Sequence, residues 1–144
     1  MAILAVDVGA GTQDILLFEE GAALESSAKM VMPSQTVIVG RQIDGARRRG
    51  SGVFLAGTTM GGGASVRSIK RHIEAGLSVF ASPKAALTIH DDLEKVKGMG
   101  VLIVESAPPE AEVVEMADVD LPALEATLER FGLDMPKDVA VAVQ

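Results

Sequence analysis

The amino-acid sequence predicts an α/β fold in which a mixed sheet is flanked by helices. Three observations lead to this prediction. Short apolar runs of strand length alternate with longer amphipathic segments, a glycine-rich turn joins the first two runs, and serine or aspartate caps precede some of the later segments. The chain has 144 residues, of which 48% are hydrophobic. It is long enough to bury a core, and we expect residues 1–144 to form a single domain.

The first third of the chain predicts a hairpin, a strand and a helix. Residues 2–7 and 14–19 are apolar, and the glycine-containing turn VGAGTQ between them is typical of a β-hairpin. A third strand is expected at residues 28–32. Over residues 35–49, apolar side chains recur every three or four positions, which is the spacing of an amphipathic helix, and Gly50 follows as a stop signal.

The rest of the chain continues the alternation. Residues 53–57 are an apolar run that predicts a strand, and the glycine loop after it leads into a helix expected at residues 66–75. Pro83 after a serine, and Asp91 with a glutamate three residues later, are typical of helix starts. The remaining expected elements are strands at residues 101–105, 112–116 and 138–144 and a helix at residues 121–131.

Charge is distributed unevenly along the chain, whose formal net charge is −7. Residues 37–72 carry seven arginines and lysines against one acid, Asp44, whereas residues 91–144 are strongly acidic. A net-acidic protein is a poor ligand for phosphate-rich polymers, so general nucleic-acid binding is not expected. The basic stretch is either a solvated helical face or a place for one small anion.

The chain contains no cysteine, which excludes disulfides, thiolate nucleophiles and cysteine-ligated iron–sulfur clusters. Metal or ligand chemistry must therefore use oxygen ligands or backbone groups. The sequence has neither a basic leader nor an apolar run of roughly 18 residues, so we expect a cytoplasmic protein without a membrane partner.

The strongest chemical signal lies in the predicted hairpin turn. Gly9 and Gly11 have no Cβ to keep an anion from the backbone amides, and Thr12 adds a hydroxyl donor. Asp7 is a candidate ligand for a divalent metal through water, and Asp14 can orient water or ligand. The alternative is a glycine-rich turn in which the two aspartates only satisfy local amides. The residues alone leave both interpretations open.

A second glycine loop follows the strand expected at residues 53–57. A glycine loop that leads from a strand into a helix can bind an anion at the free amides of the helix N-terminus, or it can simply allow close packing. It has neither the Walker pattern nor the spacing of a dinucleotide-binding loop. The candidate residues for this second anion site are Thr58, Thr59, Gly61, Gly62, Gly63 and Arg67.

The stretch AVDVGAGTQDILLFE resembles the phosphate-binding hairpin of the actin, sugar-kinase and heat-shock-chaperone ATPase superfamily. That resemblance implies a ribonuclease-H-like fold with the element order three strands, helix, strand, helix, strand, helix. It also implies Mg²⁺ and ATP as cofactors, with Gly9, Gly11 and Thr12 at the nucleotide phosphate and Asp7 beside the metal. The superfamily binds nucleotide between two such domains, so this chain, with one hairpin, is expected to bind weakly and to lack turnover without the second domain.

A wider resemblance covers nearly the whole chain. The hairpin segment, the long segment from FLAGTTMGGG to KVKGMG and the ending VAVAVQ are similar to a family of uncharacterised proteins named as pyruvate formate-lyase activating proteins. Its members are about twice as long, which together with the apolar final strand leads us to expect an N-terminal fragment. The radical S-adenosylmethionine activity that the name suggests is rejected, because its [4Fe–4S] cluster needs cysteines.

Three classes of function follow. The first is the nucleotide-binding part of an ATPase or small-molecule kinase. The second is a non-catalytic module that binds a small phosphorylated metabolite, and the third is a protein-interaction domain, including a homodimer. No catalytic residue can be assigned from the sequence.

Overall fold

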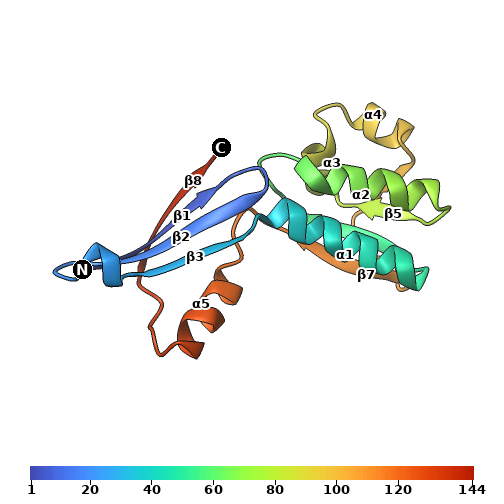
Figure 1. The fold of residues 1–144 in the computed structure, drawn as a ribbon. Coiled ribbons are helices and arrows are strands. Elements are labelled where there is room, and N and C mark those ends of the chain that lie inside the picture. The colour runs from blue at the N-terminus through green and yellow to red at the C-terminus, as the bar shows by residue number, and fades with distance from the viewer. The chain divides into compact units, whose positions relative to one another are not determined.

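The computed structural model describes residues 1–144 and has an α/β fold, as expected. The chain divides into two compact units. Unit 1 consists of Met1–Ser34 and Val119–Gln144, and unit 2 consists of Gln35–Asp118. Each unit contains its own four-stranded sheet (Figure 1). The strands therefore do not join the one mixed sheet that was expected.

Unit 1 is built around strand β1. Its elements are β1 (Ala2–Val8), β2 (Thr12–Glu19), a short 3-10 helix η1 (Leu24–Ser26), β3 (Ala28–Pro33), α5 (Leu121–Arg130) and β8 (Asp138–Val143). The strand order is β3-β2-β1-β8. Strand β2 pairs antiparallel with both β1 and β3, and β8 pairs with β1 in parallel. The expected final strand is thus confirmed, and it lies at an edge of this sheet.

One face of the unit 1 sheet packs against α5. The alternation of β1 places Leu4, Val6 and Val8 on this face, where they form a buried cluster with Leu124 and Leu128 of the helix. Helix α5 begins where the side chain of Asp120 accepts a hydrogen bond from the amide of Ala123. The opposite face of the sheet carries the alternate residues of the same strands, including Asp7 and Asp14, and both of these are exposed.

Unit 2 has an all-parallel sheet of strand order β6-β5-β4-β7. Strand β4 lies between β5 and β7, so the chain passes from β6 back to the other side of β4 before it forms β7. The elements of unit 2 are α1 (Gln35–Arg49), β4 (Gly52–Gly57), α2 (Gly63–Glu74), β5 (Val79–Ala81), α3 (Pro83–Ile89), α4 (Leu93–Gly98), β6 (Val101–Ile103) and β7 (Ala111–Met116).

The core of unit 2 forms where the helices cover one face of this sheet. Val53 and Leu55 of β4 are fully buried there with Ile43 of α1 and Ile69 of α2. The other face carries a row of paired residues that includes Phe54 of β4. The two ends of this row, Leu102 of β6 and Val113 of β7, are half exposed. Phe54 itself is buried, but the two ends of its row are open, and such partial cover of one face is unusual for a parallel sheet.

Most helix boundaries agree with the sequence analysis. Helix α1 spans residues 35–49 as expected, and α2 begins three residues earlier than expected. The serine before Pro83 caps α3. The cap of α4 was wrong by one residue: Asp92, not Asp91, accepts the amide of Glu94, because the capping side chain must directly precede the first helical residue. None of the helices combines the length and apolarity needed to cross a bilayer.

His72 is the one fully buried ionisable side chain in the core of unit 2. Neither ring nitrogen has a hydrogen bond of good geometry, although backbone groups of Ile43 and Ser51 lie near enough to favour the protonated form in part. Desolvation outweighs them and lowers the pKa of His72 below its ordinary value. The ring is therefore neutral in the folded chain at neutral pH.

This buried ring predicts an acid-sensitive stability. Because the pKa of His72 is lower in the folded chain than in the unfolded chain, the unfolded chain takes up the proton first. The free energy of unfolding should be unaffected by this group above pH about 7 and should fall as the pH drops through about 6.5, by at most about 1.4 kcal/mol per pH unit. Urea denaturation of the wild type and His72→Leu between pH 8 and pH 5 tests this. An equal pH slope for both proteins would contradict it.

Candidate functional site

The predicted phosphate-binding turn is a β-hairpin, as expected. Strands β1 and β2 pair along their whole length, with Asp7 directly opposite Asp14 and Val8 opposite Gln13. Residues directly opposite each other in an antiparallel pair project to the same face. The two carboxylates therefore lie side by side next to the turn.

The hairpin turn is held in place by hydrogen bonds to its own strands and to the end of β3. The amide of Gly9 donates to the carbonyl oxygen of Thr12 at 2.9 Å, and the amide of Ser34 donates to the carbonyl oxygen of Gly11 at 3.0 Å. The side-chain amide of Gln13 donates to the carbonyl oxygen of Pro33 at 2.9 Å. A turn fixed in this way presents its remaining groups in one arrangement.

Neither glycine of the turn has a positive φ, so the backbone does not require glycine there. At Gly9 a Cβ would lie 3.2 Å from the carbonyl oxygen of Thr12, a tight contact within the turn. At Gly11 a Cβ would meet nothing within 4 Å. Packing therefore accounts for Gly9 but not for Gly11, and the open space beside Gly11 is room for a ligand to approach the backbone.

The carboxylates lie at a hollow in the exposed face of the unit 1 sheet. The hollow has a volume of about 640 Å³, and its floor includes the small side chains of Ala5, Ala140 and Ala142. Asp7 and Asp14 line it.

Asp7 and Asp14 are the side chains of this hollow that could hold a hydrated Mg²⁺, and Lys29 lines the hollow as well. Two like charges placed directly opposite each other on a sheet repel, and a divalent cation relieves that repulsion. The side-chain amide of Gln144 already donates to both carboxylate oxygens of Asp7, at 2.9 Å and 3.1 Å. No group of three or more metal-ligating side chains occurs in the chain. Water and phosphate oxygens would therefore supply most ligands of such an ion.

The second predicted anion site is divided by the structure. Thr58, Thr59 and Gly61 follow β4 and line a pocket of about 510 Å³. Gly62 and Gly63 do not line this pocket, and Arg67 lies at a different hollow between α1 and α2.

The three backbone amides that precede the glycines of this loop have protein partners. The amides of Thr58, Thr59 and Met60 donate to the carbonyl oxygen of Met116 at 3.0 Å, to Oγ1 of Thr88 at 3.3 Å and to Oδ1 of Asp118 at 2.8 Å, respectively. These hydrogen bonds tie the loop to the ends of β7 and α3. These three amides are therefore not free to bind an anion.

The glycines of this loop have different roles. A Cβ on Gly62 would collide with Cγ2 of Val66 at 2.3 Å, and a Cβ on Gly63 would press on Thr36 at 3.1 Å. Packing therefore explains these two glycines. Gly61 resembles Gly11 of the hairpin, because nothing lies within 4 Å of its would-be Cβ.

The sequence analysis missed two residues of the same pocket, Lys84 and His90. Both belong to the α3 region, 20 or more residues away in sequence, and the fold brings them to the loop after β4. The Nδ1 atom of His90 accepts a hydrogen bond from the amide of Asp92 at 2.9 Å, which leaves Nε2 as the protonated nitrogen of the neutral ring. The sequence offered one indication of Lys84, namely that it follows the capping serine and the proline that begin α3.

Glycine substitutions should separate structural from ligand-facing positions. Gly57 ends β4 with φ +73°, and a Cβ there would lie 2.1 Å from the carbonyl oxygen of Met116. Gly57→Ala should therefore lower the free energy of unfolding by about 2 kcal/mol or more. Gly61→Ala should change it by less than about 0.5 kcal/mol, as expected for open surface positions. Urea denaturation of both variants checks this, and equal losses would refute the assignment.

Comparison with known protein families gives a match. Residues 60–144, more than half of the chain, match the model of a family described as "Putative pyruvate format-lyase activating enzyme (DUF1786)". The match includes most of the loop after β4 and all of α5 and β8, and it begins after the β1–β2 hairpin. No curated protein matches the chain.

Proposed function

The chain belongs to the family whose model it matches, and we propose that it binds the phosphate groups of a nucleotide together with Mg²⁺ on the β1–β2 hairpin. The observation that carries this proposal is the combination of open backbone at Gly11 with two carboxylates directly opposite each other beside it. A glycine that neither conformation nor packing requires, next to a paired acidic site, favours an anion and a cation bound together.

The order of elements in unit 1 supports the proposal. Unit 1 contains three antiparallel strands, then a helix and a fourth strand that is parallel to the first. This is how the actin-like and sugar-kinase superfamily fold begins, provided that unit 2 is counted as an insertion between the third strand and the first helix. The ribonuclease-H-like assignment is therefore proposed for unit 1 alone and not for residues 1–144 as one sheet.

Each residue of the hairpin has a role in this proposal. The backbone at Gly9 and Gly11 lets a phosphate approach closely, and Thr12, which is exposed, donates its hydroxyl. Asp7 and Asp14 hold the hydration shell of the metal, which neutralises phosphate charge when bound. Gln144 fixes the orientation of the Asp7 carboxylate.

Turnover needs more than this hairpin. Phosphoryl transfer depends on holding the nucleotide and its acceptor from both sides, and we assign no side chain here as a general base. We propose that catalysis, as an ATPase or small-molecule kinase, requires a second domain. The radical chemistry in the family description is not proposed, because this chain offers no cysteine for the iron–sulfur cluster.

A second candidate function rests on the pocket at the end of β4. Loops at the carboxyl ends of parallel strands are the usual binding position in open α/β sheets. The pocket has a size suited to a metabolite, open space beside Gly61 and a cation, Lys84. These features favour a small phosphorylated metabolite that binds without Mg²⁺.

Calorimetric titration with ATP, ADP and AMP, each with and without Mg²⁺, tests the two functions. If the hairpin binds the nucleotide, Mg²⁺ should strengthen ATP and ADP binding, and Asp7→Asn should remove that effect. Thr12→Val should weaken binding by about 0.5–3 kcal/mol, the range for a hydrogen bond to a neutral or charged group. Gly11→Val should abolish it, because the new side chain occupies the open space without straining the turn.

Asp134→Asn is the matched control, since Asp134 is an exposed acid of unit 1 that does not line the hollow. It should bind as the wild type does. If all three hairpin variants also bind as the wild type while Lys84→Ala weakens binding, the hairpin proposal fails and the second candidate function holds. If no nucleotide binds at all, both fail.

A further inference from the structure

The arginines of this acidic protein are concentrated on two adjacent helices. Six of the seven arginines belong to α1 and α2, which carry only two acids, Asp44 and Glu74. The arginines on these helices are Arg41, Arg47, Arg48, Arg49, Arg67 and Arg71. Such a concentration is more than a solvated face requires, since lysine or glutamate would serve solubility equally well.

Close packing of the two helices creates a notch among these arginines. Helices α1 and α2 approach closely at Gly40, where a Cβ would lie 3.1 Å from Oγ of Ser68. The notch has a volume of about 220 Å³ and is lined by Arg41, Arg67 and Arg71 together with Ser68. Three arginines from two helices therefore line one small space.

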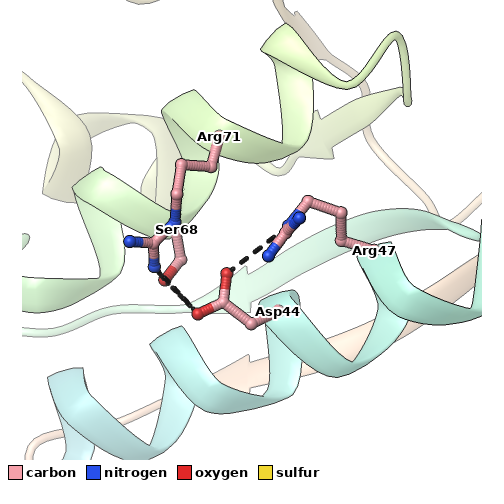
Figure 2. A network of polar contacts seen from close by, with 4 residues as sticks. All are labelled: Asp44, Arg47, Ser68 and Arg71. Atoms are coloured by element: carbon pink, nitrogen blue, oxygen red, sulfur yellow. Dashed lines mark hydrogen bonds and ion pairs between the residues drawn. The ribbon is translucent and has the colours of Figure 1, made fainter.

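Only one carboxylate is available at the notch, and it is already shared. Asp44 accepts hydrogen bonds from Arg71 at 2.8 Å and from the hydroxyl of Ser68 at 3.2 Å, and it forms an ion pair with Arg47 at 3.7 Å (Figure 2). Arg41 and Arg67, on the two sides of the notch, form no ion pair with any acid of the chain. The notch thus has a surplus of positive charge.

We propose that this notch binds the phosphate group of a small phosphorylated ligand, with Arg41 and Arg67 as the primary donors. The planar guanidinium fork matches phosphate oxygens in bidentate fashion, which explains the use of arginine in place of lysine. The volume suits a single phosphate group and not a whole nucleotide. The net charge of −7 opposes a long polyanion.

Asp44 competes with the ligand in this arrangement. Its carboxylate occupies Arg71 and Ser68, which would otherwise complete the set of phosphate donors. Removing its charge while keeping its shape should free these donors. The substitution Asp44→Asn should therefore strengthen phosphate binding at the notch. It does not depend on the hairpin, which lies in the other unit.

The test is a titration with inorganic phosphate, and separately with pyrophosphate, at constant ionic strength and without Mg²⁺. The parent protein carries Gly11→Val, which removes the proposed hairpin site. Arg41→Ala combined with Arg67→Ala should weaken phosphate binding at least about tenfold, and Asp44→Asn should strengthen it about threefold or more. Arg48→Ala is the control for each single substitution, Arg41→Ala and Arg67→Ala, because it removes one positive charge from α1 at a position outside the notch. It should change the affinity less than about twofold.

Several results would overturn the proposal. One is the absence of any phosphate binding by the parent. Another is an equal loss of phosphate affinity in Arg48→Ala and in the Arg41 and Arg67 variants, together with tighter binding of a single-stranded oligonucleotide than of phosphate. That result would indicate an extended surface for polyanions instead. A weaker affinity of Asp44→Asn would also contradict it, provided that urea denaturation shows the variant to be folded.

Discussion

The pairing of β1 along both of its edges is the constraint on which the rest of unit 1 depends. Its antiparallel partner β2 follows at once, but its parallel partner β8 comes more than 120 residues later. A parallel neighbour needs a crossover, which α5 provides by packing Leu124 and Leu128 on the buried face of the sheet. The residues between Ser34 and Val119 form a compact unit around a sheet of their own. The same pairing leaves Asp7 on the face that α5 does not cover.

Unit 2 shows how similar glycines can follow from different constraints. Gly57 allows β4 to end against β7, and Gly62 and Gly63 allow close packing at the start of α2, whereas Gly61 has open space around it. Gly40 belongs to the first group, since it allows α1 and α2 to approach and so forms the arginine notch. A glycine-rich segment is therefore better treated residue by residue than as one loop with one function.

Local features could be predicted from the sequence because they depend on neighbouring residues. The hairpin, the limits of α1 and the serine cap of α3 each follow from a few adjacent side chains. The division into two sheets could not be predicted, because the apolar run that forms β4 has the same pattern whichever strand it pairs with. For the same reason the sequence did not predict that Lys84 lies in one pocket with Thr59, or that Arg67 lines a different hollow. Contacts between distant segments determine all three.

The central claim is that a metal-bound nucleotide phosphate lies on the β1–β2 hairpin, and its position can be measured directly. We suggest recording backbone amide NMR spectra of the chain with ADP and Mg²⁺, and then replacing the Mg²⁺ in small steps with paramagnetic Mn²⁺. Because paramagnetic broadening falls steeply with distance, the account predicts that the amides of Asp7, Gly9, Gly11 and Asp14 broaden first. Broadening that begins at the loop after β4, or evenly over the acidic surface, would contradict the account.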